Sequence, residues 1–267
     1  MKTSVVSNEY QKLQEEIMKL QEQWKQNLNP DSIDFRLDSE AMKTGVPLVA
    51  LTNFDVKFPL FVQWVDELKQ LLMSQNADLE SQLNRVIELI DEETAKVWME
   101  EAFSFNHLYF KKFAEENVLD EWIPPFLAET LFRPYLQLLS EKTQSKISQA
   151  VAGCGCPVCG EPVRLGQLEG KGQKILYCPR CHANWPEKKL SCSHCGNEDY
   201  EKMKYLTVEG KPTEQIHVCD ECKGYTKIID TRQFITKPSP EMLDLKTIHL
   251  DYIAQENGYM VMGEIKK

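Results

Sequence analysis

Residues 156–222 contain the pattern Cys-x-x-Cys four times, as Cys156-Pro-Val-Cys159, Cys178-Pro-Arg-Cys181, Cys192-Ser-His-Cys195 and Cys219-Asp-Glu-Cys222. Eighteen residues separate the first two pairs, twenty-three separate the last two, and ten lie between the second and third pairs. A Cys-x-x-Cys turn brings two sulfurs to neighbouring corners of a tetrahedron, and a second turn across a hairpin can supply the other two corners. The spacing therefore predicts two consecutive four-cysteine modules, each built from two such turns, which we call knuckles.

Four thiolates about 2.3 Å from one ion form a closed Zn²⁺ site, and a tetrahedral sulfur cage also suits a single iron. The first knuckle of each module ends in a glycine, Gly160 or Gly196, which lets the backbone turn with positive φ and direct amide groups at the sulfurs. We therefore expect two metal ions, iron or zinc, one in each module. The predicted ligands are Cys156, Cys159, Cys178, Cys181, Cys192, Cys195, Cys219 and Cys222.

Other roles for the cysteines are less consistent with the sequence. Disulfides need an oxidising compartment, and the N-terminal residues lack the apolar core of a secretory signal. A thioredoxin-type redox motif needs a βαβ context, which the sequence does not indicate. Sequential pairing of the knuckles is preferred, with cross-braced pairing as the alternative. Cys154, the ninth cysteine, is interpreted as a bystander thiol. His182, His194 and His217 are expected to pack or hydrogen-bond near the sites rather than bind metal.

The formal net charge of −10 is distributed unevenly over 267 residues. Residues 1–150 carry 15 Lys/Arg and 25 Asp/Glu, whereas residues 151–237 carry 13 and 11. This distribution gives no basic footprint for nucleic acid. The chain has no apolar run approaching the roughly 18 residues of a membrane span. We therefore expect a cytoplasmic protein that binds no nucleic acid and does not cross a membrane.

Apolar residues recur at intervals of three and four through the first 150 residues, which predicts helices. The expected helices are 4–29, 59–74, 78–91, 93–116 and 126–149, with Asn76 as a cap and a break at Pro124-Pro125. Beyond Gly153, short β-type runs at 174–177, 204–208, 215–218 and 225–229 frame the second and fourth knuckles. Each module then repeats knuckle, hairpin, knuckle and aromatic residue, the last being Trp185 or Tyr225. Ser239-Pro240-Glu241 has the form of a helix start.

The predicted fold class is α+β. It consists of an all-helical N-terminal domain, two tandem rubredoxin-like or zinc-ribbon four-cysteine modules, and a C-terminal helix. The expected boundaries are 1–150 for the helical domain, 151–187 and 188–237 for the two metal ribbons, and 238–267 for the C-terminal helix and tail. Each ribbon is too small for a core of its own, so metal binding is expected to supply much of its folding free energy.

The four knuckles, Trp185 after the second, and Tyr225 after the fourth resemble the formate dehydrogenase accessory protein family, FdhE. The resemblance extends from about residue 154 to 260 and includes Asp244-Leu245, Leu250-Asp251 and Gly258-Tyr259. It implies an assembly factor rather than an enzyme. Members of the family are cytoplasmic and are thought to bind the molybdenum or tungsten catalytic subunit of formate dehydrogenase during maturation. The family implies rubredoxin-like sites that contain iron, with zinc as the alternative.

Three other functions were weighed against this interpretation. A rubredoxin-like electron carrier or iron redox sensor is the first alternative, and a zinc-ribbon nucleic-acid binder is the second. A catalytic metal is the least favoured, because eight cysteines in two full sets leave no open coordination position. The sequence leaves open a homo-oligomer, the identity of the metal, and whether the metal is structural or redox-active.

Overall fold

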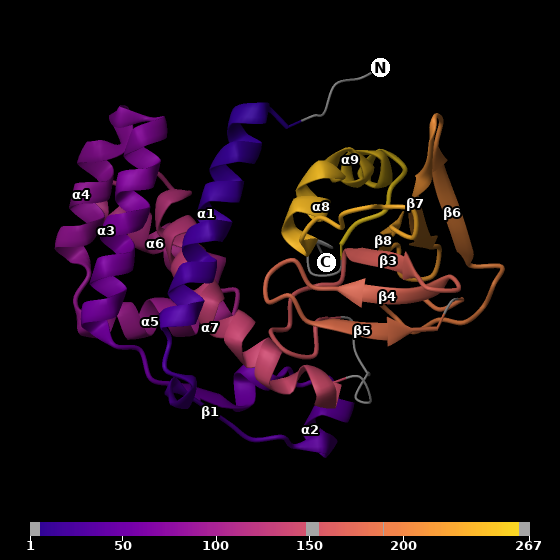
Figure 1. Ribbon diagram of the computed structural model, residues 1–267, viewed down its shortest axis with the longest axis horizontal. Coiled ribbons are helices and arrows are strands. Elements are labelled where there is room, and N and C mark those ends of the chain that lie inside the picture. The colour runs from indigo at the N-terminus through magenta and orange to yellow at the C-terminus, as the bar shows by residue number, and fades with distance from the viewer. Residues whose placement is uncertain (1–5, 148–154, 189, 262–267) are drawn as a thin grey trace. The chain divides into compact units, whose positions relative to one another are not determined.

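The structure is a computed structural model, and it describes residues 6–147, 155–188 and 190–261. The chain forms two compact units, and each unit is built from segments that are not contiguous in the sequence (Figure 1). The helical unit comprises Lys12–Asp34 and Thr52–Leu138, and the ribbon unit comprises Met1–Gln11, Phe35–Leu51 and Leu139–Lys267. Three stretches among the described part of the first 150 residues, 6–11, 35–51 and 139–147, therefore cluster with the ribbons. The domain boundaries given above stay a prediction.

Most of the elements in the first half of the chain are helices. The α-helices are α1 (Asn8–Asn27), α2 (Ser39–Lys43), α3 (Phe58–Gln75), α4 (Glu80–Leu89), α5 (Glu92–Phe103), α6 (His107–Asn117) and α7 (Ile123–Ile147). Three short 3₁₀ turns are η1 (Pro30–Ser32), η2 (Leu48–Leu51) and η3 (Ala77–Leu79). Two three-residue strands, β1 (Ile33–Phe35) and β2 (Thr52–Phe54), form a small sheet that the apolar periodicity did not predict. Asn76, predicted to cap the helix over 78–91, accepts a hydrogen bond from the Asp78 amide and caps η3 instead, and α4 begins after it without a side-chain cap.

Aromatic side chains at helical spacing form the core of the helical unit. The Trp24 and Trp64 rings stack with their centroids 5.2 Å apart, and both residues are buried. The part of α7 in this unit is apolar on nearly every side, which is typical of a central helix. Its buried residues are Ile123, Leu127, Ala128, Leu131, Phe132, Tyr135 and Leu136. The break expected at Pro124-Pro125 is absent. Both prolines lie in the first turn of α7, where a proline costs no helical hydrogen bond.

The helix predicted over 93–116 is wrong in one respect, because the chain turns in its middle. Helix α5 ends at Phe103, Phe105 adopts a left-handed φ of 56°, and α6 begins after Asn106. The Asn106 side chain caps α6 by accepting from the Tyr109 amide at 3.2 Å. No glycine or proline marks this turn in the sequence, so the continuous apolar periodicity concealed it.

The ribbon unit is built on one six-stranded sheet with the order β5-β4-β3-β8-β7-β6. Its strands are β3 (Leu165–Glu169), β4 (Gln173–Tyr177), β5 (Asn184–Glu187), β6 (Met203–Val208), β7 (Lys211–Cys219) and β8 (Tyr225–Asp230). Strands β3 to β5 belong to the first module and β6 to β8 to the second. All neighbours pair antiparallel except β3 and β8, which pair parallel and join the modules. The α+β fold class predicted from the sequence is confirmed.

The two modules repeat each other strand for strand, but the two aromatic residues are not equivalent. Tyr177 pairs with Asn184 in the first module, and Val218 pairs with Tyr225 in the second, so Tyr225 corresponds to Asn184. Trp185 shares a sheet face with Leu176, Gly166 and therefore Ile228, whereas Tyr225 lies on the opposite face because side chains alternate along β8. The expected repeat of one aromatic position is thus wrong by one residue.

Two C-terminal helices, α8 (Pro240–Lys246) and α9 (Ile248–Glu256), pack on one face of the sheet (Figure 1). The Ser239 hydroxyl caps α8 by accepting from the Met242 amide, and Pro240 occupies the first turn, as predicted. Thr247 separates the two helices, so the expected single helix is two. The core beneath them contains Leu165, Ile216, Val218, Tyr225, Ile229, Leu243, Leu250, Ala254, Tyr259 and Val261.

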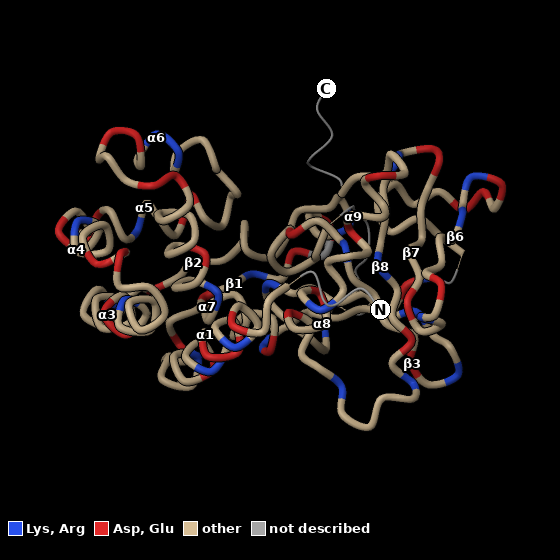
Figure 2. The backbone as a smooth tube through the Cα atoms, turned by 90° about the horizontal axis from the view of Figure 1, so that it is seen from above, with Lys and Arg blue, Asp and Glu red and all other residues tan. Residues whose placement is uncertain are grey.

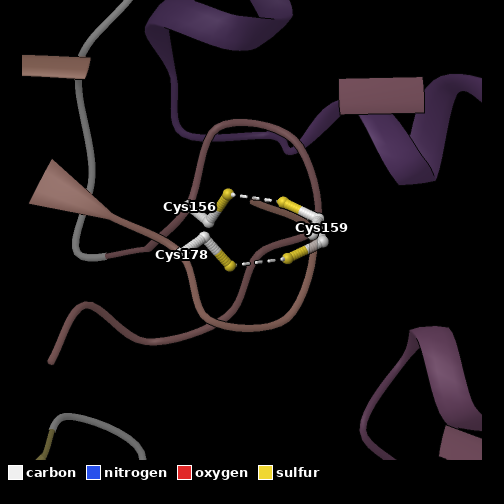
Figure 3. Close-up of side chains that lie close together, drawn as sticks. Cys156, Cys159 and Cys178 are labelled. Carbon is white, nitrogen blue, oxygen red and sulfur yellow. Dashed lines mark hydrogen bonds between the residues drawn. The ribbon is translucent and has the colours of Figure 1, made fainter. Parts of the chain in front are cut away.

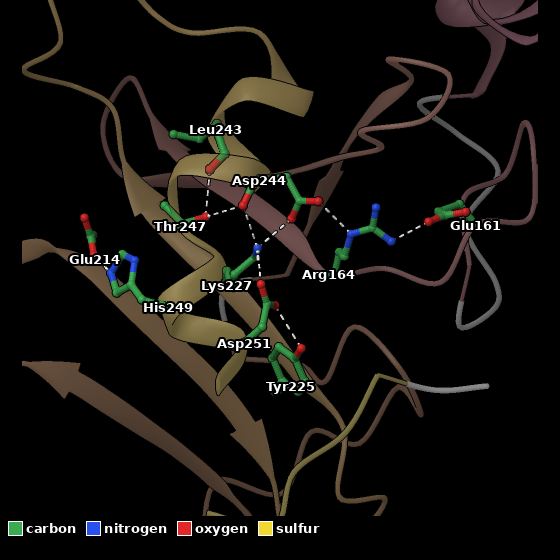
Figure 4. A network of polar contacts seen from close by, with 10 residues as sticks. All are labelled: Glu161, Arg164, Glu214, Tyr225, Lys227, Leu243, Asp244, Thr247, His249 and Asp251. Carbon is green, nitrogen blue, oxygen red and sulfur yellow. Dashed lines mark hydrogen bonds and ion pairs between the residues drawn. The ribbon is translucent and has the colours of Figure 1, made fainter. Parts of the chain in front are cut away.

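A buried ion network attaches these helices to the sheet (Figure 4). The Lys227 side chain on β8 is 1% exposed and its ammonium lies 2.6 Å from Asp244 and 2.7 Å from Asp251. Arg164 donates to the second oxygen of Asp244 at 2.8 Å and also contacts Glu161. Two cations thus face three carboxylates. Burial is the largest influence on both aspartates: it raises the pKa of Asp251, whereas the charges of Arg164 and Lys227 lower the pKa of Asp244 in spite of burial.

Asp244 pairs with both Arg164 and Lys227, whereas Asp251 pairs with Lys227, and this charge count predicts that Asp251→Asn is tolerated and that Asp244→Asn is not. The first variant removes one ion pair and the second removes two. Through its amide, the first variant can also accept from Lys227 and donate to the Tyr225 hydroxyl, which lies 2.8 Å from Asp251. We expect it to change the free energy of unfolding by less than about 1 kcal/mol at pH 7, whereas Asp244→Asn costs about 3 kcal/mol. Urea denaturation of the three proteins measures both values, and equal losses would contradict the charge count.

Because the pKa of Asp251 is raised, the difference in stability between wild type and Asp251→Asn should depend on pH. A group whose pKa is higher in the folded state favours folding at low pH, and this contribution is lost as the pH rises through the folded pKa. Relative to Asp251→Asn, the wild-type protein should therefore gain stability as the pH falls from neutral toward the ordinary aspartate pKa of about 3.9. The difference in urea midpoint between wild type and Asp251→Asn at pH 5 and at pH 8 checks the sign. A difference that stays constant would contradict it.

Acidic and basic side chains alternate along the helices (Figure 2). Exposed pairs such as Lys96 with Glu92, four residues apart at 2.8 Å, are typical of solvated helix faces. Among the described residues, no helix is long and apolar enough to cross a membrane.

Candidate metal centres

All four knuckles have the same backbone geometry. In the first, the Cys156 amide donates to the Glu161 carbonyl at 2.8 Å and the Gly160 amide donates back to the Cys156 carbonyl at 2.9 Å. The same two hydrogen bonds recur at Cys178, Cys192 and Cys219, with lengths of 2.9 to 3.0 Å. The fifth residue has positive φ in every case, as the glycines predicted for the first knuckle of each module. In the second knuckles that position is held by His182, with φ of 64°, and Lys223, with φ of 58°.

The first tetrad consists of Cys156, Cys159, Cys178 and Cys181 (Figure 3). The two knuckles face each other, so that the sulfurs of Cys156 and Cys181 lie 3.5 Å apart, as do those of Cys159 and Cys178. All four sulfurs lie within 4.8 Å of one another, and all four residues are buried.

The second tetrad consists of Cys192, Cys195, Cys219 and Cys222. Its closest sulfur pairs are Cys192 with Cys222 at 3.6 Å and Cys195 with Cys219 at 3.8 Å. The amides of His194 and Gly224 each point at a sulfur of this tetrad at 3.4 Å, on Cys192 and Cys222 respectively. The sequential pairing of knuckles is therefore confirmed, and the cross-braced alternative is wrong.

The sulfur positions fit a tetrahedral metal ion and do not fit disulfides. Four sulfurs about 2.3 Å from one ion lie about 3.8 Å from each other, whereas a disulfide needs about 2.05 Å. The observed closest separations of 3.5 to 3.8 Å match the first geometry, and all eight cysteines are free thiols. Each tetrad can hold one metal ion. Cys154 lies outside the described residues.

The thiols themselves favour a cation at each centre. In the first tetrad burial raises the pKa of Cys156 and Cys181. Burial also opposes ionisation of Cys159, but hydrogen bonds from the neighbouring thiols lower the pKa of that residue. In the second tetrad burial raises the pKa of Cys192 to about 11. Four thiolates cannot share so small a space without a positive ion, so metal binding would be coupled to proton release.

The three nearby histidines pack or hydrogen-bond, as predicted, and neither tetrad includes them. His182 bonds through Nε2 to Glu241 on α8, and His194 donates from Nε2 to the Tyr225 carbonyl at 2.7 Å. The His217 ring packs edge-on against Tyr205 with centroids 4.4 Å apart. Burial lowers the pKa of His217 to about 3, so the imidazole is neutral at pH 7.

One contact of the first centre was missed by sequence reasoning. The amides of Leu48 and Val49 in η2 donate to the carbonyls of Pro157 and Val158, at 3.0 and 2.8 Å. This segment thereby covers the tip of the first knuckle, although more than a hundred residues separate the two in the chain. No local pattern links Leu48-Val49-Ala50-Leu51 to a metal site, so only the fold reveals the contact.

Comparison with known proteins shows which family the chain resembles. A family model described as FdhE, C-terminal domain, matches residues 190–264, which include the whole second tetrad and the C-terminal helices. The protein FdhE homolog of Aquifex aeolicus (strain VF5) is 27% identical over 152 residues, covering 55% of this chain and 53% of that protein. These matches confirm that the chain resembles the FdhE family.

Other members of the FdhE family align with more of the chain. The FdhE homolog of Shewanella baltica (strain OS223) is 24% identical over 201 residues, covering 73% of this chain and 64% of that protein. The chain thus spans between half and two thirds of the length of these curated FdhE relatives. The crystal structure of the FdhE protein from Pseudomonas aeruginosa has the same fold, with a TM-score of 0.58 and 20% identity, covering 92% of this chain and 84% of that one.

Proposed function

We propose that this protein is an accessory protein for the maturation of formate dehydrogenase and that it binds the catalytic subunit of that enzyme during assembly. The similarity to FdhE proteins and the two sulfur tetrads support the proposal. The observation that carries it is the second tetrad with α8 and α9, because these residues form one packed body and coincide with the part matched by the FdhE C-terminal domain.

The proposed role of the two ions is to hold the modules in shape. Four cysteine sulfurs complete the tetrahedron at each centre and leave no coordination position for a substrate, unlike a catalytic zinc site. We therefore propose that the protein is not an enzyme and that it acts by presenting a folded surface to another macromolecule in the cytoplasm.

Co-purification tests the partner. Tagged full-length protein and the formate dehydrogenase catalytic subunit are expressed together, with the subunit made in cells that do or do not supply its molybdenum or tungsten cofactor. We expect the cofactor-free subunit to be captured preferentially. A matched bait carrying Cys156→Ser and Cys192→Ser should capture much less, since both modules would be unfolded. Failure to recover the subunit in either form, under oxidising and reducing conditions, would refute the proposal.

Metal analysis tests the role of the ions. Protein purified without oxygen should contain two equivalents of iron or zinc. Two zinc ions in a colourless protein would exclude a redox role for the metal centres. Iron with a reversible change in visible absorption would instead favour the alternative that the protein is a redox sensor.

A further inference from the structure

The two tetrads share one backbone geometry but differ in how far their sulfurs are covered. The cysteines of the first tetrad are at most 2% exposed. In the second tetrad, Cys195 is exposed and Cys222 is half-buried, although Cys192 and Cys219 remain buried. By their place in the repeat, Cys195 corresponds to Cys159 and Cys222 to Cys181, and both of those residues are fully buried. The difference therefore comes from what packs around each module.

Three segments of the ribbon unit cover the first module. Beside the Leu48 and Val49 amides on the knuckle tip, Gln144 near the end of α7 donates to the Asn184 carbonyl at 2.7 Å. On α8, Glu241 accepts from His182, which lies directly after the second knuckle. An ion held by the first tetrad would thus be enclosed by backbone and side chains that must move before solvent could reach it.

The second module is covered on one side only. The Lys223 carbonyl accepts from the Met260 amide at 2.8 Å, and the ring of His194 packs beneath Gly224. These contacts bury Cys219 and Cys192. In the stretch that follows Cys195, Asn197 donates to the Cys219 sulfur at 3.8 Å, whereas Gly196 and residues 198–201 are exposed.

Exposed carboxylates stand close to Cys195 and Cys222 in the sequence, interspersed with the exposed Lys202, Lys204 and Lys223. Glu198, Asp199 and Glu201 follow Cys195, and Glu221 lies within the fourth knuckle, all of them exposed. Some of this charge is offset by nearby lysines, for example by Lys188, which pairs with Glu198. An exposed sulfur beside carboxylates favours the approach of a cation over that of an anion, and a thiolate selects a soft one.

We propose that the second tetrad is an exchange site for soft metal ions, whereas the first tetrad holds its ion permanently. This inference rests on the proposal that both tetrads bind metal. The sulfurs of Cys195 and Cys222 are the point of entry. Cys195 and Cys222 would be the first sulfurs that an incoming soft cation could reach, and the ion already held would leave to solvent. The four sulfurs would stay thiolates, so the exchange would transfer no electron and need no proton.

Cadmium exchange tests the proposal on the full-length protein. Protein shown to contain two equivalents of zinc is mixed with Cd²⁺, desalted after set intervals, and analysed for both metals. We expect one equivalent of zinc to be replaced at least tenfold faster than the other. A parallel pulse of iodoacetamide, in which a sulfur–carbon bond forms and iodide leaves, should label Cys195 and Cys222 before any cysteine of the first tetrad in the peptide mass spectra.

Two contrary outcomes are distinguishable. If both zinc equivalents exchange at one rate, or the first tetrad is labelled first, the inference is wrong while metal binding stands. If the protein holds no metal and takes up no Cd²⁺, the proposed metal centres are themselves wrong.

A matched pair of variants tests the reason for the difference. Val49→Pro removes the amide that donates to Val158, whereas Val49→Ala keeps it. We expect the proline variant to bring the slow exchange rate toward the fast one and the alanine variant to keep the two rates apart. A slow exchange rate that is the same in wild type and Val49→Pro would overturn the role given to the segment over the first knuckle. If the proline variant does not fold, the order in which iodoacetamide labels the cysteines of the wild-type protein still decides the proposal.

Discussion

Replacing Cys156 with serine is expected to remove one of two metal equivalents and to unfold the first ribbon. A serine hydroxyl is a poor ligand for zinc or iron, and three sulfurs leave the tetrahedron open. The loss is large because binding free energies for structural zinc in small modules are about 10–16 kcal/mol at pH 7, and such modules fold only with metal. Metal analysis and limited proteolysis of the purified variant measure the two effects, with new cleavage expected between residues 156 and 187.

Two matched variants make this result specific. Cys192→Ser should also lose one equivalent, but its new cleavage sites should fall between residues 192 and 230. Cys154→Ser should retain both equivalents if Cys154 is a bystander thiol. Unchanged metal content in both Cys156→Ser and Cys192→Ser would refute the assignment of the ligands.

Replacing Lys227 with methionine is expected to cost about 3–5 kcal/mol in the free energy of unfolding. Methionine fills a similar volume, but it leaves Asp244 and Asp251 buried next to each other without the ammonium that lies 2.6 and 2.7 Å from them. Urea denaturation measures the loss, and near-ultraviolet circular dichroism should report the altered packing of Tyr225.

An exposed lysine provides the control. Lys237 pairs with Glu169 at 2.7 Å, but its side chain is 46% exposed, so Lys237→Met should cost less than about 1 kcal/mol. Adding Asp251→Asn to Lys227→Met should recover part of the loss, because it removes the carboxylate that has lost its cation, whereas Asp244 keeps its pair with Arg164. A Lys227→Met protein as stable as Lys237→Met would contradict the importance of the buried network.

The knuckles show which parts of the structure could be predicted from the sequence. Cys-x-x-Cys fixes a local turn whose sulfurs converge, so the eight ligands and the preferred sequential pairing could be predicted from spacing, and the structure excludes the cross-braced alternative. The hairpin of β6 and β7 was likewise visible in alternating apolar residues around Gly210. Strand β5 was missed because Pro186 reads against a strand, but β5 is the edge of the sheet, where proline is tolerated.

The features that depend on distant partners could not be predicted. Lys174 and Lys227 read as solvent-facing residues within strands, yet both are at most 1% exposed. Lys174 is paired with Glu187 at 2.5 Å across two strands, and Lys227 with aspartates of α8 and α9. Likewise, nothing in the sequence of residues 48–51 indicates that they cover the first knuckle. Propensity and spacing describe neighbours in the chain, whereas these contacts arise from packing.

The parallel pairing of β3 with β8 has a consequence for how the ribbons can be separated. Each of these strands is interior to the joint sheet, with hydrogen-bonding partners on both sides. A gene fragment encoding the first ribbon alone would leave β3 as an exposed edge strand, and a fragment encoding the second would do the same to β8. The unpaired amides and carbonyls of such an edge are a template for self-association. We therefore expect that neither ribbon, cut out as a gene fragment, would remain monomeric when moved into another protein.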